Sequence, residues 1–259
     1  MKQLLIIVAT AILAGGTSLA QEPHADIPNH DNQAAGKSTM SWGAEADFNY
    51  RYVWHGIAFS RGPVLQPSAY ISKYDLTFTV WSNVNLNNEP QRGEVTETDL
   101  IFGYSRTWEG WKAEAGYYVY LNRPPHGASD PATSEIWTKV SHAAGPVSIF
   151  TTHTFDVHSY RGAYYGDAGV GFERKLRRAT INSTVSAGWA SAKFNETYVG
   201  PARSAFNFLG GDFSMTCPLT PHFSVRPHVE VSRIMDNELR RALTSPSVWS
   251  AGLAFGADF

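Results

Sequence analysis

The sequence predicts an all-β fold, a single transmembrane antiparallel up-and-down β-barrel of about 12 strands. Segments that alternate apolar and polar residues recur from residue 40 to the end of the chain, as strands with two different faces require. Short turns and long loops alternate between them, and no apolar run reaches the ~20 residues of a membrane-spanning helix. The alternative is a secreted β-sandwich, which would have to bury its outward aromatic residues elsewhere.

The first predicted strand, residues 40–54, shows the pattern most clearly. Its even positions are all apolar or aromatic: Met40, Trp42, Ala44, Ala46, Phe48, Tyr50, Tyr52 and Trp54. Its odd positions are polar or small except for Val53. We therefore expect one face of this strand to contact lipid and the other to contact the lumen.

Eleven further segments are predicted to be strands: 64–72, 76–86, 97–108, 111–121, 135–141, 147–155, 164–172, 181–189, 205–215, 223–231 and 247–259. Segment 205–215 fits least well, because Phe206 and Phe208 share one phase while Leu209, Phe213 and Met215 share the other. Gly210-Gly211 is predicted to mark a β-bulge there.

The connections predict the orientation of the barrel. Short turns are expected near residues 73, 109, 143, 176 and 218, and longer loops near 58, 90, 127, 159, 197 and 240. Bacterial outer-membrane barrels have even strand numbers, short periplasmic turns and long extracellular loops. We therefore expect a barrel in the cell outer membrane with both termini in the periplasm.

Outward aromatic residues are predicted to form two girdles at the membrane surfaces. The periplasmic girdle comprises Trp42, Trp108, Trp111, Phe172, Phe223 and Phe259, and the extracellular one comprises Trp54, Tyr164, Trp189 and Trp249.

The start of the chain predicts export. Lys2, a short apolar run and the small residues Ser18 and Ala20 are typical of a secretory signal peptide over residues 1–20. Residues 21–39 lack periodicity and are expected to be a flexible periplasmic lead-in to a barrel over 40–259. The terminal Phe259 resembles the signal that such barrels present to the outer-membrane barrel assembly machinery. The lipid bilayer and lipopolysaccharide are the other expected partners.

Composition excludes several function classes. The formal net charge of −2 gives no basis for nucleic-acid binding, and the single cysteine, Cys217, cannot form an intramolecular disulfide. His24, Asp26, His30 and Asp31 lie in the lead-in without a fixed geometry, so we predict no metal site and no cofactor.

Three short stretches resemble a known family. Tyr50-Arg51-Tyr52-Val53-Trp54-His55-Gly56-Ile57, Gly62-Pro63-Val64-Leu65-Gln66 and Val80-Trp81-Ser82-Asn83-Val84 are similar to motifs of the TorF-type putative outer-membrane porins. The resemblance covers about 40 residues and implies a barrel fold and a porin-like function. His55 departs from the pattern, because the family commonly has Arg there, so no role is carried over to it.

Inward-facing charges are the chemistry that remains. The candidate pore-lining residues are Glu45, Asp47, Arg51, Glu97, Asp99, Lys112, Glu114, Glu135, Lys139, Asp167, Arg226 and Glu230. With Glu173, Asp212 and Asp258, the inward set has eleven acids and four bases, which favours cations in a pore. The alternative is salt bridging that merely packs a narrow barrel. Aromatic residues are also expected to point inward, and they could constrict the lumen or line a binding site: Trp81, Tyr118, Trp137, Phe150 and Tyr165.

The sequence therefore predicts a porin or narrow channel for small solutes. The alternative function is a non-conducting barrel with a structural or surface-binding role. No enzyme is predicted. Lipid-hydrolysing barrels carry a His-x-Ser pair on the lipid-facing side, whereas the phase of His222 and Ser224 points into the lumen beside a short turn. His153 faces outward beside Thr151 and is expected to be a girdle histidine.

Overall fold

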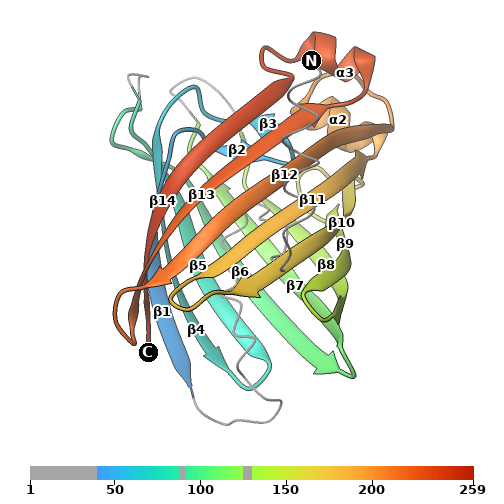
Figure 1. Cartoon of the computed structure of the whole chain (residues 1–259). Helices are drawn as coiled ribbons and strands as arrows, with labels where there is room; N and C mark the ends of the chain where they lie inside the picture. Colours follow the sequence, from blue (N-terminus) through green and yellow to red (C-terminus); the bar gives the residue numbers. More distant parts are fainter. Residues whose placement is uncertain (1–39, 88–90, 125–129) are drawn as a thin grey trace, which may run out of the picture.

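The computed structural model describes residues 40–87, 91–124 and 130–259. Within them, twelve antiparallel strands close into one barrel (Figure 1), which confirms the predicted fold class and strand count. No helix in these three ranges is both long and apolar enough to cross a membrane. The predicted signal peptide and lead-in lie outside the described residues.

Each wall strand pairs with its neighbours in the sequence, and the first wall strand pairs with the last. The wall strands are β1 (Ser41–Asn49), β4 (Val64–Lys73), β5 (Leu76–Asn85), β6 (Val95–Trp108), β7 (Trp111–Asn122), β8 (Thr133–Ala144), β9 (Val147–Asp156), β10 (Tyr164–Lys175), β11 (Thr180–Ala190), β12 (Ala205–Pro218), β13 (Phe223–Ile234) and β14 (Ser247–Asp258). Phe48 lies opposite Leu253 where β1 and β14 close the barrel. Closure leaves these twelve strands without a free edge.

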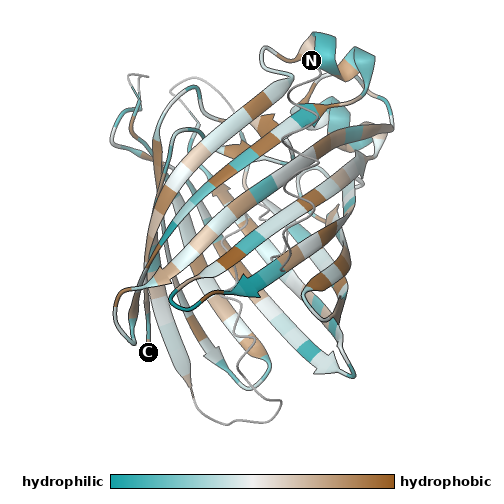
Figure 2. Cartoon of the chain, in the orientation of Figure 1, coloured by the Kyte–Doolittle hydropathy of each residue, from teal (hydrophilic) through white to brown (hydrophobic). Residues whose placement is uncertain are grey.

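The outer wall is apolar, as a bilayer requires. Large hydrophobic side chains are exposed along the strands, with Phe48 at 47%, Ile149 at 55% and Trp249 at 54%. Figure 2 shows apolar residues alternating with polar ones along the strands, while the helix α3 (Asn237–Ala242) is mostly hydrophilic.

The two ends of the barrel differ, and we call them the turn end and the loop end. The turn end carries the short connections and the carboxy terminus (Figure 1). Tyr74, Glu109 and Gly110 have positive φ in its turns. The loop end carries α3 and α2 (Ala192–Tyr198), which are capped by Asp236 and Ser191. The loops predicted near residues 197 and 240 thus each contain a helix.

The first strand is shorter than predicted. β1 ends at Asn49, and the chain then turns inward to form the hairpin of β2 (Val53–Trp54) and β3 (Ile57–Ala58). Tyr52 and Trp54 are each only 5% exposed, so the prediction that they face lipid is wrong. The alternating pattern does not distinguish the two cases, because a residue buried inside the barrel is as apolar as one that faces lipid.

The bulge in β12 lies at a different place from the prediction. The register between β11 and β12 shifts at Gly188 and Trp189, which lie opposite Phe208 and Phe206, so that Asn207 is the extra residue. Gly210-Gly211 pairs regularly. The bulge resolves the conflict in phase, because Phe206 and Leu209 can then both point outward at 46% and 45% exposure.

The remaining predicted rim aromatics lie on the outer face, most of them well exposed. At the turn end, Phe259 pairs through its backbone with Trp42, and their rings stack with centroids 4.4 Å apart. The His222 ring also stacks on Phe259, with centroids 5.0 Å apart, and lies in an exposed turn, so the prediction that it faces the lumen is wrong.

Candidate functional site: the barrel lumen

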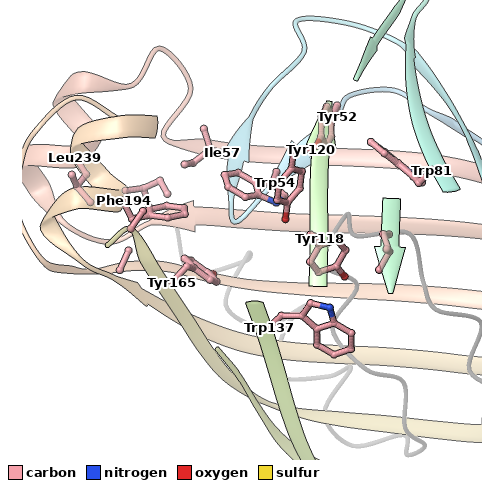
Figure 3. Close-up of a cluster of buried hydrophobic side chains, with 14 of the residues drawn as sticks. Tyr52, Trp54, Ile57, Trp81, Tyr118, Tyr120, Trp137, Tyr165, Phe194 and Leu239 are labelled. Carbon is pink, nitrogen blue, oxygen red and sulfur yellow. The ribbon is translucent and has the colours of Figure 1, made fainter. Parts of the chain in front are cut away.

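The loop end of the lumen is filled by residues 50–62, which we call the plug. Tyr52, Trp54 and Ile57 belong to one buried apolar cluster with side chains from the wall and both helices (Figure 3). The other members are Val64, Trp81, Ile101, Tyr118, Tyr120, Trp137, Ala163, Tyr165, Ala190, Phe194, Ile234 and Leu239. The plug is therefore packed like a protein core and is not a loose loop.

Aromatic contacts hold the plug to the loop-end helices. The Trp54 ring lies 5.6 Å from Phe194 and 4.9 Å from Tyr198, both on α2. The His55 ring stacks on Tyr165 of the wall at 3.6 Å. Burial, with the charges of nearby carboxylates, raises the pKa of the Tyr198 hydroxyl, which stays neutral at physiological pH.

The turn of the plug depends on two residues with positive φ. His55 has φ 49° and Gly56 has φ 77°, as a two-residue hairpin turn of type I′ requires. A Cβ added to Gly56 would lie 2.9 Å from Cβ of Phe208, so this position has neither the conformation nor the space for a side chain.

The three stretches that resemble the TorF-type motifs meet at the plug. Tyr52 of the first lies with its ring 5.6 Å from that of Trp81, which belongs to the third. Val64 of the second is 1% exposed in the same cluster. The motif residues therefore share a structural role, which is to pack the plug against β4 and β5.

The turn end of the lumen is polar and contains ion pairs. Arg226 of β13 donates to Glu45 of β1 at 2.6 Å. Lys112 and Glu114 of β7 lie 3.1 Å apart. Asp47 accepts from His228 at 3.0 Å. β1 and β13 lie on either side of β14 at the closure of the barrel, so the contacts of Arg226 and His228 tie β1 to β13 across β14.

His228 and an amide ladder are lumenal features that the sequence reasoning missed. Asn49 donates to Gln66 at 2.9 Å, Gln66 to Asn83 at 3.1 Å, and Asn83 to Thr96 at 2.8 Å. The ladder crosses β1, β4, β5 and β6. The inward phase of these residues, taken across neighbouring strands, was the signal that could have revealed it.

Other predicted acids lie nearer the plug. Asp99 and Glu135 are each 2% exposed, and Glu135 accepts a hydrogen bond from Tyr120 at 2.9 Å. Asp167 and Glu230 line a hollow of about 470 Å³, including the solvent space at its mouth, whose other lining residues include His55 of the plug. Glu97 is partly buried on the same strand as Asp99.

Two of the predicted basic residues, Lys139 and Arg51, contact aromatic rings. The ammonium of Lys139 lies 5.1 Å from the ring centroid of Phe150. The guanidinium of Arg51 lies 5.6 Å from the ring centroid of Tyr50, and the Arg51 backbone N–H donates to the hydroxyl of Ser250. All five aromatic residues that were predicted to point inward are at most 6% exposed.

A hydrogen-bonded chain lies on the outer wall around His153. Trp189 donates to the Tyr164 hydroxyl at 2.9 Å, and that hydroxyl lies 2.9 Å from Nδ1 of His153. Thr151 lies 3.2 Å from Nε2 of His153 and donates its own proton to the carbonyl of Asp167 at 2.8 Å. Because the Thr151 proton points to a carbonyl, His153 is not arranged to accept it.

No family model and no curated protein matches the chain. Among solved structures, the NanC porin matches with a TM-score of 0.54 and 12% identity over 83% of this chain and 98% of that one. The KdgM porin in complex with disordered oligogalacturonate matches with a TM-score of 0.49 and 8% identity, over 85% of this chain and 98% of that one. Outer membrane phospholipase A from Escherichia coli matches with a TM-score of 0.44 and 15% identity, over 83% of this chain and 92% of that one. At these identities the similarity to NanC shows the fold alone, and the two lower scores add nothing to it.

Proposed function

We propose that the chain is an outer-membrane porin that passes small solutes through its lumen. The observation that carries the proposal is the contrast between the two faces of the wall. The outside is apolar, whereas the inside carries charged and amide side chains from the turn end up to the plug. Polar side chains inside a closed membrane barrel are expected where water and solutes pass. NanC, a porin of the same fold, supports this proposal.

Within this function we propose a mild preference for cations. The twelve candidate pore-lining residues include more acids than bases, and carboxylates in a narrow lumen act on ions within a Debye length, about 8–10 Å near physiological salt. Two of the bases already pair with acids, because Arg226 bonds Glu45 and Lys112 bonds Glu114. These pairs moderate the preference.

We further propose that the loop end faces the cell exterior and that both termini are periplasmic. Long loops and both helices gather at one end, while the short turns and Phe259 lie at the other. The exposed Phe259 side chain is available to the barrel assembly machinery, and the outer wall is available to lipid and lipopolysaccharide.

We also propose membership of the TorF-type porin group, on the ground that its three motif stretches pack together at the plug. An enzymatic role is not proposed. The outward His153 chain directs the Thr151 proton away from the histidine, so it lacks the nucleophile–base hydrogen bond of a hydrolase.

One observation favours a second candidate function, a barrel that does not conduct and binds partners at its loops. The plug residues Tyr52, Trp54 and Ile57 are almost completely buried, as in a permanently closed lumen.

Single-channel conductance of the refolded mature protein in planar bilayers tests the two functions. Discrete steps in potassium chloride, with a reversal potential of cation sign in a salt gradient, are expected of the porin. An absence of steps would favour the closed barrel.

Labelling of intact cells tests the orientation. In a Cys217→Ser background, a cysteine at Glu196 of α2 should react with an impermeant maleimide, and a cysteine at Thr220 in a turn should not. The reverse result would overturn the orientation.

A further inference from the structure

The connection between β10 and β11 carries the densest positive charge in the sequence, and we call residues 174–178 the basic turn. Four of these five residues are basic and exposed: Arg174, Lys175, Arg177 and Arg178. The backbone N–H of Leu176 donates to the carbonyl of Ala179 at 2.7 Å, which leaves Arg177 and Arg178 at the tip. Figure 2 shows the end of β10 and this turn as strongly hydrophilic.

The positive charge of the basic turn is not neutralised by neighbouring side chains. In the described parts of the chain, no ion pair joins any of the four bases to a carboxylate. Glu173, the adjacent acid, shares the lumenal phase of the buried Asp167. The connections at 109–110, 145–146 and 219–222 contain no Lys or Arg. The charge is therefore concentrated at one point of the turn end.

The basic turn lies at the edge of the lipid-facing wall. Val170 is 50% exposed on the outer face of β10, and Phe172 and then Arg174 follow it in the same phase. Two residues of a strand tilted by about 40° span about 5 Å of membrane depth. The headgroup layer beside the hydrocarbon core is about 5–8 Å thick. Since Phe172 belongs to the predicted aromatic girdle, Arg174 lies at the depth of the lipid phosphates.

The side chains of the basic turn match a phosphate group that is attached to an apolar body. Three of the four bases are arginines, whose planar guanidinium groups can donate two parallel hydrogen bonds to one phosphate. Between them, Leu176 is 45% exposed. A soluble polyanion would meet the charges and leave this leucine in water, whereas a phospholipid offers both anionic oxygens and an apolar surface.

We propose that the basic turn binds the headgroup of an anionic phospholipid, such as phosphatidylglycerol, in the leaflet at the turn end. Arg174 meets the phosphate from the wall, Arg177 and Arg178 meet it from the aqueous side, and Leu176 contacts the glycerol and the start of the acyl chains. The proposed orientation makes this the periplasmic leaflet. The inference goes beyond the porin function and does not depend on conduction.

Competition between two phospholipids tests the site. The full mature protein in detergent micelles is incubated with equal amounts of phosphatidylglycerol and phosphatidylcholine, and native mass spectrometry counts the lipids that it retains. Each basic side chain near an anionic lipid favours binding by about fivefold, so two or more engaged bases should give a preference of at least about tenfold for phosphatidylglycerol. Equal retention of the two lipids would overturn the proposal.

Two variants localise the binding. Changing all four bases of the turn to Gln should reduce the preference for phosphatidylglycerol to within about twofold of none, because it removes every positive charge of the turn. The double variant Arg177→Gln with Arg178→Gln alters only the tip, outside both strands, and provides a second test if the quadruple variant fails to fold. It should weaken the preference at least about fivefold. An unchanged preference in both variants would overturn the proposal.

The matched control removes the same number of charges from the loop end, through Arg161→Gln, Lys193→Gln, Arg240→Gln and Arg241→Gln. This variant should retain phosphatidylglycerol as the wild type does. An equal loss of preference in the control would mean that net charge attracts the lipid, and would overturn the assignment to the basic turn.

Two further measurements distinguish a lipid from other anionic partners and from the orientation. sn-Glycerol 3-phosphate in hundredfold excess should not displace the lipid, and displacement would show that the turn recognises a free phosphate. Purified peptidoglycan should bind the wild type and the quadruple variant of the basic turn alike, and weaker binding by the variant would favour a cell-wall partner and overturn the lipid. Labelling of intact cells at Thr220 would overturn the periplasmic leaflet and leave the micelle result standing.

Discussion

The two ends of the lumen are built from the same alternating strands, yet different interactions stabilise them. At the loop end, Tyr52 and Trp54 leave the wall and pack with aromatic residues into a core. At the turn end, Glu45 and Asp47 pair with Arg226 and His228 across the barrel closure. The loop end is held by apolar burial and the turn end by ion pairs, so salt and mutation should affect them differently.

The largest effect is expected from emptying the loop end. Tyr52→Ala with Trp54→Ala should increase single-channel conductance severalfold, because it removes two rings from the lumen. Loss of a packed Trp typically costs about 3–5 kcal/mol, so heat-modified mobility on gels should show lower stability as well. Trp108→Ala, which removes an outward Trp that is 48% exposed at the turn end, is the control and should leave conductance unchanged. Equal conductance in the double variant and wild type would mean that the plug does not limit flow.

A smaller effect is expected at the turn end. Arg226→Met removes the partner of Glu45 and one lumenal positive charge, so the reversal potential in a salt gradient should move further toward the cation value. Adding Glu45→Gln should move it back. A shift toward anion preference in Arg226→Met would contradict the assignment of these side chains to the conduction path.

The smallest effect concerns the turn of the plug. Gly56→Ala places a side chain at φ 77° against Phe208, and the left-handed conformation alone costs an L-residue about 1–2 kcal/mol. We expect a lower unfolding midpoint in urea in lipid vesicles. Gly145→Ala is the matched control, because Gly145 has φ 62° and nothing within 4 Å of an added Cβ. If both variants lose the same stability, the Phe208 contact contributes nothing.

Much of the wall could be predicted from the sequence, because a two-residue period is imposed by lipid on one side and water on the other. The strand count and the inward direction of Trp81 and Trp137 followed from it. The inward hairpin at His55-Gly56 did not, because burial in a protein core selects the same apolar residues as burial in lipid. The bulge was predicted at Gly210-Gly211 because glycine is common at bulges. In the structure it lies at Asn207, a buried residue whose side chain donates a hydrogen bond to Asn195.

Site residues were harder to predict than the wall. Phase alone gave the direction of Glu45 and Arg226 but not their pairing, which joins residues 181 positions apart. The partner of Asp47 could not be predicted either, because His228 is 181 positions away in the sequence and phase does not show which inward side chains meet across the lumen. Phase likewise gave the direction of Lys139 but not its contact with the Phe150 ring.

The pairing of Trp42 with Phe259 has a consequence for the order of folding. Every other strand pair joins neighbours in the sequence, so each hairpin can form as a local contact, whereas β1 and β14 must meet across nearly the whole chain. By the logarithmic dependence of loop-closure entropy on length, that contact costs about 4 kcal/mol more than closing a hairpin. All other wall contacts are local in the sequence, so we expect the pairing of β1 with β14 to be the slow step of folding. The barrel can therefore close only after β14 has been synthesised.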